Sequence, residues 1–297
     1  MDDDIRVPCV KWGGFEISRL LIGHNPMKGQ SHFTPELDAE MRQWYAPDTG
    51  HDIEVLRRCE EVGINCAQFG ASQMFDVLRR HKAAGGSMQW IATLYGNEAG
   101  DLGFGKQIGT AEEIAELLRM DPKPIGIQHY GEKTDRLFME GKLDYVRERM
   151  KMLRDTGLLV GVGTHLSRVA EEIASQDWDV DFFQTCFYKV YSRDDERVID
   201  RAHERFDEEC REAMARFVSR APKPCLCFKI LGANRKCRTD ESVREALKFA
   251  YGVAKPTDVA VVGMWQKYKD QVGQNAKWVC EILKARSRSD PGITNRA

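Results

Sequence analysis

The sequence lacks the features that mark several classes of protein. None of its apolar runs approaches the roughly 18 residues that a membrane-spanning helix needs. The 44 basic and 46 acidic residues are interspersed and give a net charge of −2, so no strongly basic region is present to bind nucleic acid or a membrane surface. The start Met-Asp-Asp-Asp has no positively charged signal-peptide region. We expect a soluble cytoplasmic protein without nucleic-acid or membrane partners, although an exported protein whose leader was removed would look the same.

The cysteines also lack the spacing of a metal site. The chain has nine, an odd number, and no two of them form a Cys-x-x-Cys pair, so zinc-ribbon and cluster-ligand assignments fail. Cys225 and Cys227 lie two residues apart on a predicted strand, which puts both thiols on one face at a spacing unsuited to structural zinc. We expect reduced thiols packed in the core.

What the sequence does contain is an alternation of apolar runs and helical segments. Eight short runs are apolar throughout, which is typical of buried parallel strands, and a length of 297 residues is ordinary for a (β/α)8 barrel. The sequence therefore predicts an α/β fold: a single TIM-barrel domain over residues 1–297, with an N-terminal β-hairpin cap at 1–17 and a flexible polar tail at 287–297. The stretch between His24 and His51 is too long for an ordinary βα loop and is predicted to form a lid or site wall.

Polar side chains stand where the predicted strands end. These ends are expected near Gly23, Gln68, Leu94, His129, His165, Gln184, Lys229 and Gly263. The helices are expected near residues 52–63, 74–84, 111–119, 142–156, 167–175, 194–220, 239–251 and 267–285. Because the carboxyl ends of barrel strands converge on one mouth, a shared site is predicted there. Its expected polar members are His24, Gln68, His129, His165, Gln184 and Lys229.

Several segments, in order and spacing, resemble the aldo/keto reductase superfamily over nearly the whole chain. They are Lys11 to Gly23, Leu56 to Asn65, Gly141 to Gly161, Val261 to Met264, and the pair Gln271-x-x-x-Asn275. The resemblance implies NADP-dependent carbonyl reduction on a barrel. It also implies cofactor contacts at five positions. Thr164 and Gln184 would hold the nicotinamide carboxamide, Phe228 would stack on the nicotinamide ring, and Gln271 and Asn275 would contact the adenine. Lys229 departs from the small residue that the family places near the pyrophosphate.

The family's catalytic tetrad of Asp, Tyr, Lys and His is mostly missing. Gln68 occupies the aspartate position, the region that should carry the tyrosine has no phenol, and Leu94 occupies the lysine position. Only the histidine is kept, as His129. Tyr95 is adjacent to Leu94 but is expected to point to the other face of its strand. The chain therefore lacks the tyrosine that donates the proton in the family's carbonyl reduction, and the lysine cation that would lower the pKa of such a phenol.

Other side chains could supply replacement chemistry. His129, His165, Lys229 and Glu132 are candidate catalytic groups for acid–base or Schiff-base steps. The imidazoles of His24, His129 and His165 could also hold Zn²⁺ or Mn²⁺ with an open position. Candidate substrate-binding residues are His24, Asn25, Gln68 and Tyr188. Each has a plainer interpretation: a hydrogen-bonded strand-end histidine, a solvated lysine or glutamate, or a tyrosine packed beneath a loop.

Three functions stay open at this point, and the missing tetrad residues favour the first over the second. The first is an enzyme of this fold that acts on a sugar-like or carbonyl small molecule by His/Lys acid–base chemistry, with or without metal, as a lyase, isomerase or hydrolase. The second is an NADP-dependent oxidoreductase with a rearranged proton donor. The third is a non-catalytic nucleotide or sugar sensor. The oligomeric state is not predicted.

Overall fold

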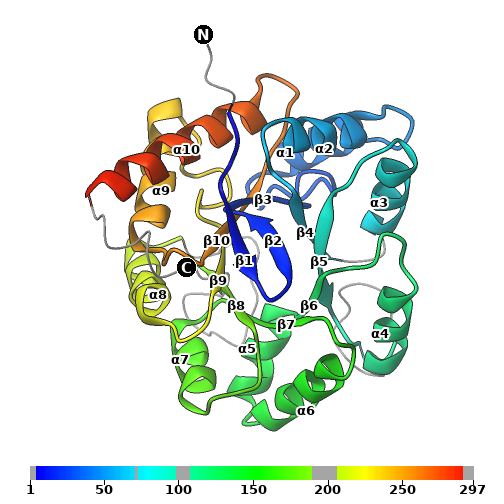
Figure 1. Ribbon diagram of the computed structural model, residues 1–297, viewed down its shortest axis with the longest axis vertical. Helices are drawn as coiled ribbons and strands as arrows, with labels where there is room; N and C mark the ends of the chain where they lie inside the picture. The colour runs from blue at the N-terminus through cyan, green and yellow to red at the C-terminus, as the bar shows by residue number, and fades with distance from the viewer. Residues whose placement is uncertain (1–4, 71–72, 98–107, 189–205, 290–297) are drawn as a thin grey trace.

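The computed structural model describes residues 5–70, 73–97, 108–188 and 206–289. Its centre is a closed barrel of eight parallel strands in the order β10-β3-β4-β5-β6-β7-β8-β9 (Figure 1). The strands are β3 (Leu20–Gly23), β4 (Cys66–Gly70), β5 (Gln89–Leu94), β6 (Gly126–His129), β7 (Leu159–Thr164), β8 (Phe182–Cys186), β9 (Cys225–Phe228) and β10 (Val259–Gly263). The predicted (β/α)8 fold is confirmed.

The predicted hairpin closes the amino-terminal end of the barrel. Strands β1 (Cys9–Trp12) and β2 (Phe15–Ser18) pair antiparallel and lie across the barrel centre in Figure 1. The Trp12 ring stacks on Phe182 at the start of β8, with ring centroids 5.0 Å apart, and its indole N–H donates to the carbonyl of Thr257. Among the described residues, the hairpin therefore covers this end of the barrel and leaves the opposite mouth for a ligand.

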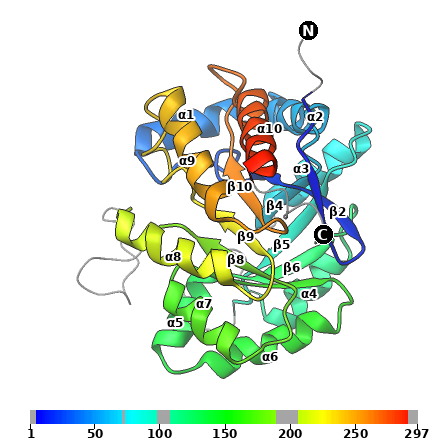
Figure 2. The same cartoon turned by 60° about the vertical axis from the view of Figure 1, so that its left-hand side comes forward.

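Helices surround the barrel on its outside (Figures 1 and 2). They are α1 (Pro35–Trp44), α2 (His51–Glu61), α3 (Gln73–Ala83), α4 (Thr110–Leu118), α5 (Gly131–Met139), α6 (Leu143–Arg154), α7 (Ser167–Ser175), α8 (Glu208–Arg220), α9 (Asp240–Val253) and α10 (Gln271–Ser289). In the described residues, none of these helices combines the length and apolar character needed to cross a membrane.

Two of the helices were not predicted. Helix α1 lies inside the stretch expected to be a long loop, and it begins at Pro35 with the Thr34 hydroxyl accepting from the amide of Leu37. Helix α5 starts two residues after β6, and its buried face carries polar side chains, so it shows no apolar stripe in the sequence. Part of the helix expected at 194–220 and most of the expected tail lie outside the described residues.

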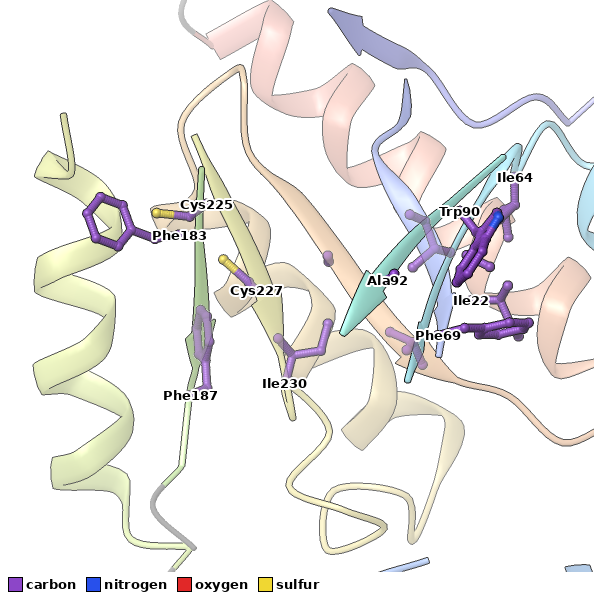
Figure 3. Packing of buried hydrophobic residues seen from close by; sticks show 14 of the residues in the cluster. Ile22, Ile64, Phe69, Trp90, Ala92, Phe183, Phe187, Cys225, Cys227 and Ile230 are labelled. Atoms are coloured by element: carbon purple, nitrogen blue, oxygen red, sulfur yellow. The ribbon is translucent and has the colours of Figure 1, made fainter. Parts of the chain in front are cut away.

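Side chains alternate between the inside and the outside of the barrel. Leu21, Cys66 and Ile91 point inward and form a small core with the hairpin. Their neighbours Phe69 and Trp90 belong to the larger core between strands and helices, as Figure 3 shows. This alternation decides which polar strand-end residues reach the mouth.

Candidate functional site at the barrel mouth

A cavity of about 410 Å³ opens at the carboxyl end of the barrel. Its walls come from the segments that follow β3, β9 and β10 and from the first turns of α10. Seven residues predicted for the site line it: His24, Asn25, Gln68, Phe228, Lys229, Gln271 and Asn275. Its size falls in the range of small-molecule and cofactor sites, about 300–1,000 Å³.

The turn after β9 forms one wall and has an unusual backbone. Lys229, Gly232, Ala233 and Asn234 have φ angles of +56°, +57°, +46° and +74°, a left-handed conformation that side chains other than glycine's rarely adopt. Such residues persist where surrounding structure holds them, often at ligand sites. The buried Lys229 Nζ lies 5.6 Å from the centroid of the Phe206 ring, and Phe228 packs against the inner core beside the cavity.

The segment between β10 and α10 forms the opposite wall. The Gln271 side chain accepts a hydrogen bond from the backbone amide of Trp265 (2.8 Å), so this glutamine shapes the wall as well as lining it. Asn275 is only 4 % exposed and presents a buried amide to the cavity. The Trp265 and Tyr268 rings meet edge to face at 5.4 Å.

His24 lies deep in the cavity wall as a neutral imidazole. Its Nδ1 sits 3.1 Å from the carbonyl oxygen of Gln68 and 3.2 Å from the amide nitrogen of Gly70, so either tautomer finds a backbone partner. Burial, reinforced by the Lys28 ammonium, lowers the pKa of His24 to about 3. The ring can hydrogen-bond a ligand but does not take up a proton near neutral pH.

A row of uncharged side chains crosses the floor of the mouth. Gln68 and Gln128 both donate to the Thr93 hydroxyl, at 2.8 and 3.2 Å, and Gln128 also donates to Gln184 at 2.6 Å. The buried Oε1 of Gln128 has no hydrogen-bond partner among the described residues. Gln184 therefore points inward as predicted but joins this row, and it does not line the cavity.

Tyr95 also points to the inner side of the barrel, contrary to the prediction, but it does not line the cavity. Leu94 belongs to the outer core, so the next residue faces inward. A β-carbon built on Gly70 would lie 2.5 Å from the Tyr95 hydroxyl oxygen and 3.3 Å from the Thr93 side chain, which places the phenol over the inner face of β4. The prediction failed because it took Leu94 to be the inward residue.

A half-buried glutamate and a buried lysine hold the backbone at Tyr95. The Glu113 carboxylate accepts from the amides of Tyr95 and Gly96, at 3.0 and 2.6 Å, and burial raises the pKa of this carboxyl. The Lys133 ammonium donates to the carbonyl oxygen of Tyr95 at 3.0 Å and also to that of Gly96. The position of the phenol is therefore held by charge-assisted hydrogen bonds from α4 and α5.

His129 does not reach the mouth. Gln128 occupies the inward position on β6, so His129 points outward and is fully buried between the barrel and the helices. Its Nδ1 lies 2.8 Å from the Thr134 hydroxyl on α5, and its Nε2 lies 3.4 Å from Arg149 on α6. The prediction of His129 as a catalytic residue at the mouth is wrong, because the strand's alternation sends it to the opposite face.

His165 and Thr164 converge on a buried carboxylate. Asp135, on α5, is fully buried and accepts from the Thr164 hydroxyl, from the His165 backbone amide (2.9 Å) and from His165 Nδ1 (3.0 Å). Thr164 thus points outward, and its predicted contact with a nicotinamide carboxamide is wrong. The His165 ring meets Phe228 edge to face at 5.4 Å, so it reaches the border of the site without lining the cavity.

The remaining candidates lie away from the cavity. Glu132 sits in the first turn of α5, 7 % exposed, with an Oε2 that has no hydrogen-bond partner among the described residues. Tyr188 is buried against Phe206 and beneath Gly232. It therefore packs under the turn after β9 and does not line the cavity, where it was predicted to bind substrate.

The predicted metal ligands are not brought together. His24 is held between backbone groups of β4, His129 faces the outer layer, and His165 is bound to Asp135. In the described part of the chain, no three His, Cys, Asp or Glu side chains cluster in a way that could hold a metal ion. The sequence analysis also missed Trp265, Tyr268 and Gln274 in the cavity wall. Their only signal was their place just after the last strand.

Comparison with known proteins supports the fold. No protein-family model and no curated protein matches the chain. An archaeal fructose-1,6-bisphosphate aldolase, whose catalytic lysine was captured as a carbinolamine, is 12 % identical over 89 % of this chain and 93 % of its own, with a TM-score of 0.53. A truncated 3-deoxy-D-arabino-heptulosonate 7-phosphate synthase from Thermotoga maritima is 13 % identical over 96 % and 93 %, with a TM-score of 0.49. No family model or curated relative shows membership of the aldo/keto reductase superfamily, so that membership stays a prediction.

Proposed function

We propose that the protein is an enzyme that binds a nicotinamide dinucleotide in the cavity and oxidises or reduces a small carbonyl or hydroxyl compound at the mouth. One observation carries this proposal. Phe228, Lys229, Gln271 and Asn275 come from segments up to 47 residues apart, yet all line one cavity. They include most of the residues that sequence resemblance assigned to a dinucleotide.

The chemistry of the cavity wall fits such a ligand. Phe228 offers an aromatic face beside the barrel axis, and Asn275 offers a buried amide to the polar edge of a base. The Lys229 ammonium and the left-handed turn that follows it are suited to a diphosphate, since consecutive backbone amides in such turns form anion-binding concavities. A bound nicotinamide would supply the hydride acceptor or donor.

The accompanying proton needs a group at the mouth. The Tyr95 phenol is our candidate for the group that donates it to, or takes it from, the substrate oxygen, because it faces inward and its backbone is held on both sides by Glu113 and Lys133. The neutral ring of His24 would hydrogen-bond and orient the same oxygen. This makes Tyr95 the rearranged proton donor of the oxidoreductase hypothesis.

Binding can be tested without knowing the substrate. Trp265 lines the cavity, so titration of NADH and NADPH should quench tryptophan fluorescence or give energy transfer to the nicotinamide. The signal should fall strongly in Trp265→Phe, while calorimetry on the same variant still detects binding. Trp278→Phe, on α10 but not among the residues that line the cavity, is the matched control and should keep the signal. Absence of any response to either dinucleotide at millimolar concentration would count against the proposal.

One observation supports a second candidate. Lys229 has a buried Nζ and lines the same cavity as His24, an arrangement that suits Schiff-base chemistry of a lyase on a sugar-like carbonyl compound. Incubation with small aldehydes or ketones and borohydride, followed by mass spectrometry, would find a stable adduct on Lys229 in this case. An unmodified Lys229 across a panel of carbonyl compounds would remove this candidate and leave the first untouched.

A further inference from the structure

We infer that the cavity selects a dinucleotide whose outer ribose carries a free 2′-hydroxyl, NAD(H), over its 2′-phosphorylated form, NADP(H), and that Asp240 is the specificity-determining residue. This inference rests on the proposed function. Two observations support it: the charged residues around one end of the cavity, and the side chains that cap helices α9 and α10 there.

The relevant end lies between α9 and α10. If the reacting ring occupies the barrel axis near Phe228 and Gln68, the rest of the molecule must extend away from the axis. The cavity continues in that direction to Cys237, Lys269 and Gln274. Helices α9 and α10 lie side by side there (Figure 2). We call this region the outer end of the cavity.

Three cations near the outer end are paired with carboxylates. Lys269 pairs with Asp240, Lys267 pairs with Glu40 at 2.5 Å, and Arg58 pairs with Asp270 at 2.7 Å. Three cations thus face three carboxylates, and their charges sum to zero. A 2′-phosphate carries about −1.5 to −2 charges near neutral pH and needs surplus positive charge.

The helix N-termini at this end are occupied as well. The Asp270 carboxylate accepts from the amide of Gly273 (2.9 Å) and thereby caps α10. Thr239 and Ser242 form a reciprocal capping box at the start of α9. A phosphate that approached either helix would have to displace a group of the protein itself, so neither provides an anion site.

Asp240 is placed to accept hydrogen bonds and to repel a phosphate. Its Oδ1 pairs with Lys269 and its Oδ2 accepts from the Gln274 amide at 2.6 Å, and both partners line the cavity. Lys269 and Gln274 lower the pKa of Asp240, so the group is ionised near neutral pH. A carboxylate beside the adenosine ribose is the arrangement by which other dinucleotide sites prefer a 2′-hydroxyl.

The experiment compares NADH and NADPH on the full-length protein by fluorescence titration and calorimetry, both independent of turnover. We expect NADH to bind at least tenfold more tightly than NADPH. In Asp240→Asn, Lys269 loses its partner and becomes available, so NADPH should tighten at least fivefold while NADH changes less than threefold. Added salt should reduce the NADPH gain.

Glu241→Gln is the matched control. Glu241 is exposed, lies in the same helical turn and carries the same charge, but it does not pair with Lys269. It should leave the ratio of the two affinities within twofold of wild type.

Each remaining outcome is decisive. Equal affinities, or tighter binding of NADPH, would overturn the inference while leaving the proposed function in place. Equal effects of the two variants would overturn the assignment to Asp240. If neither dinucleotide binds, the proposed function itself fails and the inference fails with it.

Discussion

The two sides of the barrel mouth have similar sequence patterns but different structures. On the side of β3, β9 and β10, polar residues after the strands line an open cavity. On the side of β6 and β7, the strand-end residues His129 and Thr164 face helices and are fully buried. Position at a strand end therefore does not place a residue in the site. The alternation along the strand and the helix that follows it decide the outcome.

Helix α5 accounts for much of the difference. It begins at Gly131 and lies against β7, where it brings Asp135 to the end of that strand. A side chain at Gly131 would meet the Thr164 amide at 3.1 Å and the His165 ring at 3.0 Å, so this close approach needs glycine. We therefore expect substitutions on the α5 side to affect folding first, and those on the cavity side to affect binding first.

The largest expected effect is on stability, at Asp135. Asp135→Ala removes the acceptor of three buried hydrogen bonds and should lower the free energy of unfolding by about 3–5 kcal/mol, as measured by urea denaturation. The exposed Asp155→Ala is the control and should change stability far less. A near-neutral Asp135→Ala would show that this cluster does not hold the two strand ends.

The next effect is on binding, at Lys229. Lys229→Met keeps the length of the side chain but removes the charge that we assign to the diphosphate, so dinucleotide affinity should fall about tenfold to a hundredfold, or about 1.4–2.7 kcal/mol. The unfolding free energy should change by less than about 1 kcal/mol. Lys248→Met, on the exposed face of α9, should bind as wild type does. If both lysine variants behave alike, Lys229 is not part of the ligand site.

A third effect depends on pH and comes from His24. Its pKa falls from 6.5 to about 3 on folding, so below pH 6.5 the unfolded chain takes up a proton that the folded chain excludes. Stability should therefore decline on acidification, by about 1.4 kcal/mol per pH unit, and reach about 2 kcal/mol at pH 5. His24→Gln should reduce the decline between pH 7 and pH 5 by that amount. Between pH 7 and pH 8 the two proteins should show the same slope, and an unchanged acid decline in the variant would contradict the assignment.

The smallest effect is at helix α1, whose Leu37 and Met41 line the cavity. Thr34→Ala removes the hydroxyl that accepts from the Leu37 amide and should cost about 1 kcal/mol of stability. Dinucleotide affinity should weaken less than threefold, because helix α1 stays in place and only its first turn unfolds more often. Thr34→Ser keeps the cap and should behave as wild type. A large loss of affinity in Thr34→Ala alone would mean that α1 closes over the ligand.

The sequence predicted the parts of this fold that depend on local pattern. In the described residues, the strands that are apolar throughout, the hairpin before β3 and the helices with an apolar stripe appear near their predicted places, although only Glu208–Arg220 of the helix predicted at 194–220 is described as helix. Helix α5 was not predicted because Lys133, Thr134 and Asp135 are polar and yet buried. Hydrogen bonds to groups on neighbouring elements offset the free-energy cost of burying them, and the sequence does not show those partners. Helix α1 was not predicted because Met41 is its single buried residue, so the sequence shows almost no apolar stripe there.

For the site, the sequence by itself determined which residues stand at the carboxyl ends of the strands, because each apolar run stops there and turn residues follow it. It did not determine which of them face the mouth. A shift of the strand register by one residue in β5 or β6 would exchange the residues that face inward and outward. A strand buried on both sides is apolar throughout, so its sequence does not show which residues face inward. Only closure of the barrel decided it: Gln128 and Tyr95 turned inward, His129 turned outward, and the cavity formed beside Lys229.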